Sequence, residues 1–198
     1  MRKHIAILKG GSSSERVISE QTAANIADSL DAEKYIPFLI DVTHGEWWYE
    51  DADAGTRYPV NKTDFSVPLP SKKLSFDFAI IAIHGTAGED GSLQGYFEMM
   101  RIPYSSSGIL ASSLSFDKIR CKQFVKGFGI PMANEVVLRK GDTIAADAIA
   151  KQLGMPCFVK PNTAGSSFGV TKVFKAEELE EAVFKAYTED STVIIEEF

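Results

Sequence analysis

The residues from Lys160 to Gly169 (KPNTAGSSFG) combine one lysine with a run of small and hydroxyl-bearing side chains. Small residues let backbone N–H groups approach phosphate oxygens, and the hydroxyl and ammonium groups add further donors. The spacing differs from that of a P-loop, because the pattern G-x-x-x-x-G-K-[ST] is absent. Spacing alone leaves two interpretations open: a phosphate-binding loop, or an ordinary hairpin loop, which fits at least as well.

A second glycine-rich stretch, from His84 to Gly95 (HGTAGEDGSLQG), lies between an apolar run and an expected helix over 92–100. The run Phe78–Ile83 is typical of a buried strand. In an open α/β sheet, a strand, a turn and a helix in this order form a ligand crevice at the carboxyl end of the strand. A lone histidine is more often structural, but this position favours ligand contact for His84. Asp90 is expected to cap the helix.

A third turn, from Gly10 to Glu15 (GGSSSE), separates an expected strand over 4–9 from an expected helix over 16–30. The N-terminus of such a helix can receive an anion. Glu15 has two interpretations: a residue of the crevice, or an acid that stabilises the first helical turn by ~0.3–1 kcal/mol. Acids are common at this position for the second reason, so the pattern by itself favours the second interpretation.

Lys118 and Lys122 lie one turn apart on an expected helix over 117–128, so their ammonium groups can share a direction. Taken alone, such a pair is usually a solvated face. Cys121 and Cys157 form no close-spaced pair, which indicates a reduced, cytosolic protein.

Strands and helices alternate in the first half of the chain, which predicts a doubly wound parallel sheet. Pro37 places the strand over 35–41 at or near a sheet edge, and a short strand is expected over 102–104. The segment 44–74 predicts short strands and turns whose order the sequence does not define. A domain boundary is expected between Gly108 and Phe116. Beyond it we expect strands and helices over 134–138, 143–153, 156–160, 168–174, 177–187 and 192–198.

Composition excludes two kinds of partner. The 198 residues are 44% hydrophobic and carry a formal net charge of −6. An acidic chain without a dense basic block gives no electrostatic case for nucleic acid. The longest apolar run, Phe78–Ile83, is too short to span a bilayer. The sequence therefore predicts no nucleic-acid partner and no membrane.

In their order along the chain, these motifs resemble those of D-alanine–D-alanine ligases, members of the ATP-grasp superfamily. The resemblance rests on the Gly10–Glu15 turn, the highly specific His84–Gly95 stretch, Asp117-Lys118, the Lys160 loop and the strand 194–198. It implies an α/β fold with an open parallel sheet, the pre-ATP-grasp substrate domain, over 1–110. The first (α+β) half of an ATP-grasp domain would follow over 111–198 and end in the adenine hinge strand. The third domain of the family is absent from this sequence, so we expect an amino-terminal fragment that is inactive alone.

The resemblance also implies a reaction. ATP phosphorylates the carboxylate of a first D-alanine, and the amine of a second D-alanine attacks the acylphosphate, for peptidoglycan precursor synthesis. The implied cofactors are ATP and Mg²⁺ (or Mn²⁺), whose ligands would lie in the third domain; the implied setting is a cytoplasmic homodimer. Carried over by position, the catalytic residues are Glu15, which would hold the ammonium group of the first D-alanine, and its partner Ser166. The residues expected to bind substrate are His84, Val17 and Ser19. The residues expected to bind the cofactor are Lys118, Lys160, Ser167, Glu196, Glu197 and Phe198.

Two mild departures from the family pattern, Val17-Ile18 and Ser105-Ser106, leave these assignments in place. Two alternatives remain. One is a ligase whose second substrate is D-lactate or D-serine, and the other is a non-catalytic α/β binding module that only retains the crevice.

Overall fold

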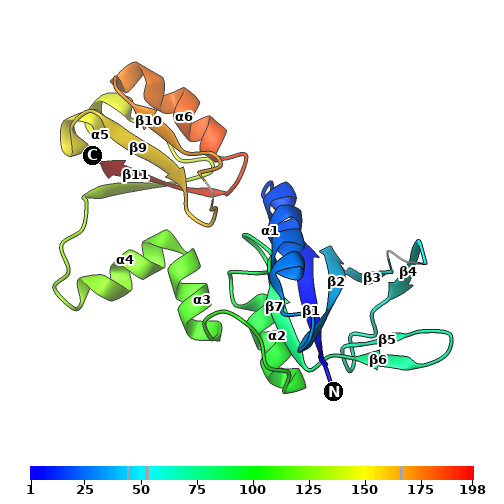
Figure 1. Cartoon of the computed structure of the whole chain (residues 1–198). Helices are drawn as coiled ribbons and strands as arrows, with labels where there is room; N and C mark the ends of the chain where they lie inside the picture. Colours follow the sequence, from blue (N-terminus) through cyan, green and yellow to red (C-terminus); the bar gives the residue numbers. More distant parts are fainter. Residues whose placement is uncertain (44, 52–53, 166) are drawn as a thin grey trace. The chain divides into compact units, whose positions relative to one another are not determined.

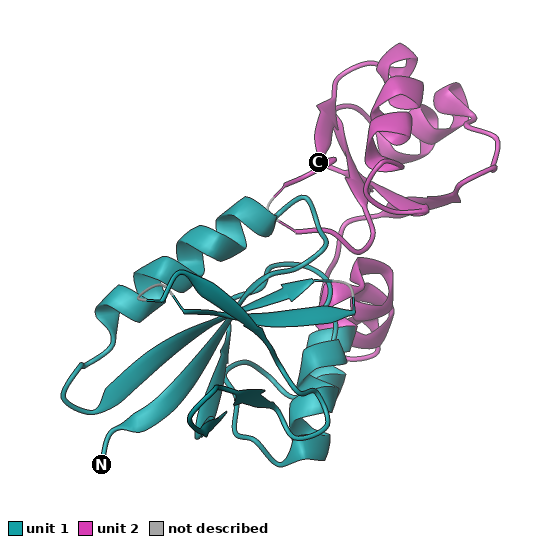
Figure 2. Ribbon diagram, turned by 90° about the vertical axis from the view of Figure 1, so that its right-hand side faces the viewer, with its two compact units in different colours: residues 1–113 teal, residues 114–198 magenta. Residues whose placement is uncertain are grey.

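The computed structural model describes residues 1–43, 45–51, 54–165 and 167–198, which form two compact units, Met1–Ser113 and Leu114–Phe198 (Figure 2). We refer to them as unit 1 and unit 2. Among the described residues, no helix is long and apolar enough to cross a membrane.

A mixed sheet with the strand order β4-β3-β2-β1-β7 forms the centre of unit 1 (Figure 1). Its parallel part consists of β1 (Lys3–Gly10), β2 (Tyr35–Thr43) and β7 (Phe78–Ile81). The strands β3 (Glu46–Asp51) and β4 (Thr56–Pro59) extend it in antiparallel fashion. The hairpin of β5 (Ser66–Pro68) and β6 (Lys73–Ser75) lies outside this sheet. The predicted open parallel sheet is thus confirmed for the strands that carry the two turns, and the segment 44–74 adds the antiparallel strands.

Helices cover both faces of this sheet, which explains why β1 is apolar at successive positions. Ile5 and Ile7 pack with Ala23 of α1 (Arg16–Ser29). Ala6 and Leu8 belong to the cluster that contains Leu93 and Phe97 of α2 (Ser92–Met100). Each turn that follows a strand is therefore held between a packed strand and a packed helix.

Two expectations for unit 1 need correction. Pro37 lies in β2, an inner strand, but β3 pairs with β2 only from Ile40 to Thr43 in the described residues, so the Pro37 end is locally an edge. Residues 102–104 form no strand in the described chain, where Tyr104 makes an isolated bridge to Ala79. The division between the units, after Ser113, lies within the expected range from Gly108 to Phe116, and this range folds as α3 (Ile109–Phe116).

Unit 2 is built on an antiparallel sheet with the strand order β10-β9-β11-β8. The expected hairpin is present, although its second strand begins at residue 171 because residues 168–170 still form the turn. The helix expected from residue 143 begins only at residue 146. The elements are α4 (Lys118–Lys126), β8 (Glu135–Arg139), α5 (Ala146–Leu153), β9 (Cys157–Pro161), β10 (Thr171–Val173), a 3₁₀ turn (Ala176–Glu178), α6 (Leu179–Ala186) and β11 (Thr192–Glu197).

The core of unit 2 occupies one face of this sheet. Val159, Val193 and Ile195 pack with Leu179 and Val183 of α6. Because successive side chains of a strand point to opposite faces, Lys160 on β9 and Glu196 on β11 project from the other face. That face is free to carry charged side chains.

Candidate functional site

The turn at Gly10–Glu15 and the loop after β7 lie against each other in unit 1. The Ser13 hydroxyl donates a hydrogen bond to the His84 carbonyl at 3.1 Å. The Oε2 atom of Glu15 lies so close to Gly85 that a Cβ atom there would be 3.1 Å away. The two stretches singled out in the sequence therefore meet at the carboxyl edge of β1 and β7, where a crevice is expected in this fold.

Glu15 is a buried acid, with 3% of its surface exposed. It occupies the N-cap position of α1, but within the described chain its side chain makes no capping hydrogen bond. The carboxylate therefore gives the helix no capping hydrogen bond, and it lies beside Gly85. A buried carboxylate is costly unless a cation or hydrogen-bond donors offset its charge, so this position suits an ammonium group.

The other residues assigned to substrate lie on or beside α1. The Nε2 atom of His84 is 3.2 Å from the Thr22 hydroxyl. The hydroxyl of Ser19, which is fully buried, accepts a hydrogen bond from the Gly10 N–H at 3.0 Å and so holds the turn. Val17 is 61% exposed and free to contact a ligand.

The loop 84–91 is stabilised by its own polar side chains. Glu89 accepts a hydrogen bond from the Gly85 N–H at 2.8 Å. The side-chain amide of Gln94, fully buried in α2, donates to the Gly88 carbonyl at 2.6 Å. A Cβ atom on Gly88 would lie 2.1 Å from the Ile83 carbonyl oxygen, so only glycine fits there. The motif thus specifies a tightly folded loop.

The prediction that Asp90 caps α2 is wrong. The N-cap residue is Gly91, whose φ of 92° places it in the left-handed region that glycine tolerates. Asp90 instead accepts a hydrogen bond from the Ser92 N–H at 2.9 Å, one residue beyond the cap. Its side chain therefore shapes the turn that precedes the helix.

Sequence reasoning missed the pair of Arg16 and Asp41 at the same edge of the sheet. Asp41, at the end of β2, has a side chain only 5% exposed and contacts the Arg16 guanidinium at 2.6 Å. Arg16 also donates to the Thr43 hydroxyl at 3.2 Å. The hydrogen bond to Asp41 raises the pKa of Arg16, because it outweighs partial burial, which acts to lower that pKa. The sequence did contain a signal for this pair: Asp41 directly follows a run of apolar residues, and an acid buried at such a position needs a cationic partner.

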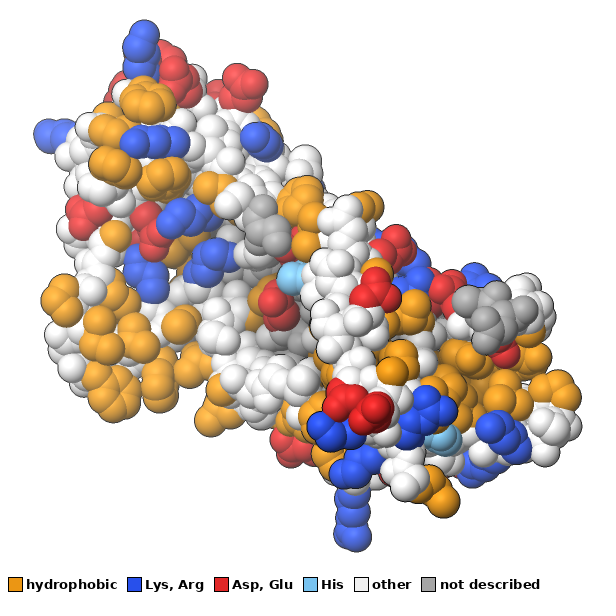
Figure 3. Space-filling view, viewed as in Figure 1, with side chains coloured by type: hydrophobic (Ala, Val, Ile, Leu, Met, Phe, Trp, Pro, Cys, Tyr) orange, Lys and Arg blue, Asp and Glu red, His pale blue; other side chains and the backbone are white. Residues whose placement is uncertain are grey.

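Unit 2 carries a cluster of lysines and glutamates on the sheet face opposite α5 and α6. Glu196 on β11 lies between two lysines: its Oε1 atom is 2.7 Å from the Lys122 Nζ, and its Oε2 atom contacts the Lys160 Nζ. Figure 3 shows basic and acidic side chains side by side on this part of unit 2. Burial acts to raise the pKa of Glu196, but hydrogen bonds from both lysines outweigh it and leave that pKa below its usual value.

Lys118 does not share its partners with Lys122, contrary to the common direction expected from their spacing. Its Nζ donates to the carbonyl of Ala164 at 2.6 Å and to that of Asn162 at 3.1 Å. It thereby ties the start of α4 to the loop after β9. Burial and the nearby charge of Lys160 lower the pKa of Lys118.

The remaining residues assigned to the nucleotide lie around the ends of β9 and β11. Ser167 is exposed with a φ of 62°, and Ser166 lies outside the described residues. Glu197 accepts hydrogen bonds from the Asn134 N–H at 2.7 Å and the Asn134 side chain at 2.9 Å. Phe198 is 75% exposed, and the Lys172 Nζ lies 3.5 Å from its ring centroid. These groups offer an aromatic surface next to cations.

No group of three or more His, Cys, Asp and Glu side chains in the described part of the chain is arranged to hold a metal ion. We therefore derive no step through Mg²⁺ from the residues described.

The two units define a mixed α/β protein with a pre-ATP-grasp domain followed by part of an ATP-grasp domain. Residues 4–107 match the family model of the D-ala D-ala ligase N-terminus, and residues 124–198 match that of the D-ala D-ala ligase C-terminus. The chain therefore belongs to the D-alanine–D-alanine ligase family, as the motifs predicted.

Comparison with individual proteins of this family shows which fraction of their length this chain covers. It is 44% identical to the D-alanine–D-alanine ligase of Bacteroides fragilis over all 198 residues, but covers only 61% of that protein. The D-alanine–D-alanine ligase of Coxiella burnetii matches the whole chain with a TM-score of 0.83 and 28% identity, and 62% of it is covered. The Bacillus anthracis enzyme complexed with ATP matches 99% of the chain with a TM-score of 0.71 and 31% identity, and 58% of it is covered. The chain thus spans about three fifths of the length of these relatives.

Proposed function

We propose that the full-length protein joins two D-alanines at the expense of ATP, through a D-alanyl phosphate, to supply a peptidoglycan precursor. The observation that carries the proposal is the end of β9, where Lys160 lies beside Glu196 on the open sheet face and leads directly into the Gly/Ser loop. In a chain of this family, that arrangement suits the phosphates of ATP.

We assign the nucleotide to unit 2, within the ATP-grasp half over 111–198. A carboxylate that attacks a phosphate brings two anions together, so cations must offset the repulsion. One pair of unit charges ~4 Å apart interacts by roughly 4 kcal/mol at an effective dielectric constant of about 20. Lys118 and Lys160 supply this charge, Ser167 adds a donor, and Glu196, Glu197 and Phe198 contact the adenine and ribose.

We assign the first D-alanine to unit 1, within the substrate domain over 1–110. Its ammonium group pairs with the buried carboxylate of Glu15, while Val17, Ser19 and His84 line the same edge. The role of Ser166, as the partner of Glu15 in the loop that covers the phosphates, stays a prediction from the resemblance. A closed loop keeps water from the acylphosphate, which would otherwise hydrolyse.

The proposal also covers the location, the oligomeric state and the metal ligands of the full-length protein. The full-length protein would act in the cytoplasm as a homodimer, and its Mg²⁺ ligands would lie outside the residues described here. These features leave the roles of the named side chains unchanged.

The test is ADP formation by the full-length protein with D-alanine, L-alanine, or D-alanine plus D-lactate or D-serine. The proposal expects ADP and D-alanyl-D-alanine with D-alanine alone, and neither product with L-alanine. A mixed product in preference to the dipeptide would indicate the alternative second substrate. Failure of the protein to bind either ATP or D-alanine in calorimetry would instead indicate a non-catalytic module.

A further inference from the structure

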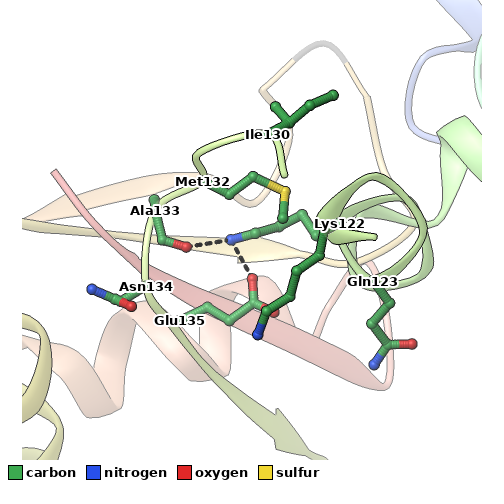
Figure 4. A pocket seen from close by; sticks show the side chains of 8 residues that line it. Lys122, Gln123, Ile130, Met132, Ala133, Asn134 and Glu135 are labelled. Carbon is green, nitrogen blue, oxygen red and sulfur yellow. Dashed lines mark hydrogen bonds and ion pairs between the residues drawn. The ribbon is translucent and has the colours of Figure 1, made fainter. Parts of the chain in front are cut away.

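Lys122 connects three segments of unit 2 through one ammonium group. Its Nζ lies 2.7 Å from Oε1 of Glu196 on β11 and 2.9 Å from the carbonyl of Ala133, and it also contacts Oε2 of Glu135 on β8. Figure 4 shows the Lys122 side chain extending toward Ala133 and Glu135. Only 15% of this side chain is exposed, so the solvated face expected from the sequence is wrong for Lys122.

The number of donors separates Lys122 from Lys160. An ammonium group has three N–H donors. Lys122 donates hydrogen bonds to the Ala133 carbonyl and to Glu196, and its charge is also paired with Glu135, so protein groups surround it on three sides. In the part of the chain that the structure describes, the acceptor of Lys160 is Glu196 alone. Lys160 therefore keeps donors for a phosphate, whereas the ammonium group of Lys122 is held by three protein groups.

Glu196 couples the two lysines, because each of them occupies a different oxygen of its carboxylate. Without Lys122, both oxygens would be available to Lys160, and a closer pair would hold that lysine away from a ligand. Burial acts to lower the pKa of Lys122, but the hydrogen bonds to Glu135 and Glu196 outweigh it and raise that pKa. Lys122 therefore remains charged.

We propose that Lys122 is a positioning residue for ATP binding: it holds the Glu196 carboxylate by one oxygen, so that Lys160 can exchange from Glu196 to a phosphate oxygen. This inference rests on the proposed function, in which Lys160 contacts ATP. It gives Lys122 no contact with substrate.

A cavity beside Lys122 makes a conservative replacement feasible. An open pocket of about 400 Å³ is lined by Gln123, Lys126, Met132, Asn134 and neighbouring residues (Figure 4). An arginine side chain has room to extend there and would keep the positive charge next to Glu196. A methionine would fill a similar volume without donors.

The test compares Lys122→Met and Lys122→Arg with the control Lys151→Met, an exposed lysine of α5, in the full-length protein. With ATP as the varied substrate, K122M should raise the ATP KM by roughly tenfold, as expected for the loss of a hydrogen bond to a charged group. The KM for D-alanine and kcat should change much less, and K122R should restore most of the ATP affinity.

An ATP KM of K122M equal to that of K151M would overturn the inference. Equal losses in every kinetic parameter, with no rescue by arginine, would also overturn it and indicate a structural role. If K122M does not fold, a K122R variant with an unchanged ATP KM supports the inference and one with a tenfold higher KM contradicts it. A wild-type protein without D-alanine-dependent ATP turnover would contradict the proposed function itself.

Discussion

The guanidinium group of Arg16 lies 2.6 Å from the buried carboxylate of Asp41, and this pair joins the start of α1 to the end of β2. Removal of the arginine alone would leave a buried acid whose other cation, Arg57, is 3.4 Å away and largely exposed. We expect Arg16→Met to lower the free energy of unfolding by about 1–3 kcal/mol, less than for a fully buried pair because Arg16 is partly solvated.

A double variant tests the cause of this loss. Arg16→Met combined with Asp41→Asn should be more stable than Arg16→Met alone, because no unpaired charge remains buried. Urea unfolding followed by tryptophan fluorescence measures the effect in unit 1, since both tryptophans of the chain, Trp47 and Trp48, lie on β3. Equal stabilities of the single and double variants would show that the buried charge is not the cause.

Gly88 and Gly95 provide a matched pair of glycines in one motif. Gly88→Ala places a Cβ atom 2.1 Å from the Ile83 carbonyl, whereas the nearest atom to a Cβ on Gly95 is 3.8 Å away. We expect Gly88→Ala to destabilise unit 1 by ~2 kcal/mol or more. Gly95→Ala, inside α2, should be neutral or stabilising by about 0.5–1 kcal/mol. Tryptophan fluorescence in urea measures both, and a Gly88→Ala variant as stable as wild type would refute the packing argument.

Glu15 and Lys160 carry the two halves of the proposed chemistry. Glu15→Gln keeps the shape of the side chain but removes its charge, so the KM for D-alanine should rise by roughly tenfold or more. Lys160→Ala should reduce kcat/KM for ATP by a comparable or larger factor, because a charge-assisted contact to phosphate is lost. Steady-state kinetics of the full-length protein measures both, with the exposed Glu33→Gln and Lys151→Met as controls. Wild-type rates in both variants would refute these assignments.

Glu196 makes the stability of unit 2 depend on pH. Its pKa is lowered from the usual 4.5, since hydrogen bonds from Lys122 and Lys160 overcome the effect of burial. Glu135, opposite it on β8, is the acid that faces the same lysine. Because the folded pKa is depressed, the stabilisation is complete well above pH 4.5 and is lost as the pH falls through the folded pKa.

Acid unfolding followed by circular dichroism tests this dependence. Wild type should lose stability more steeply than Glu196→Gln as the pH falls below 4.5. The exposed Glu181→Gln serves as the control and should follow wild type. Parallel curves for wild type and Glu196→Gln would contradict the prediction.

The sequence predicted the parts of the fold that depend on local patterns. The apolar runs of β1 and β7 and the glycine turns after them occur where the pattern placed them, and the hairpin of β9 and β10 is present with a shorter second strand. It did not predict α3, whose apolar and serine residues carry no capping or breaking signal before Asp117. The antiparallel strands β3 and β4 lie in the segment 44–74, whose turns gave no order: β3 pairs with β2, and β4 pairs with β3.

Residues that belong to a sequence motif could be predicted as site residues. Residues whose role depends on contacts with side chains distant in sequence could not. The family motifs named Glu15 and Lys160, but only the structure shows that the Glu15 side chain is buried and makes no capping hydrogen bond in the described residues. Lys122 looked like a solvated lysine because its acceptors, Ala133 and Glu196, are distant in sequence. Which lysine pairs with which glutamate in this cluster depends on the tertiary structure, so the sequence alone does not predict it.

The transfer of oxygen from substrate to phosphate tests the central claim most directly. If the carboxylate of the first D-alanine attacks the γ-phosphate of ATP, a new P–O bond forms to a carboxylate oxygen while the bond from the γ-phosphorus to the bridging oxygen breaks and ADP leaves. Attack by the second amine then breaks the C–O bond, and that oxygen leaves with the phosphate. With D-alanine labelled by ¹⁸O in its carboxylate, the full-length protein should release phosphate that carries one ¹⁸O atom per dipeptide formed. Phosphate free of the label, beside labelled dipeptide, would contradict the acylphosphate route and the roles assigned to Glu15 and Lys160.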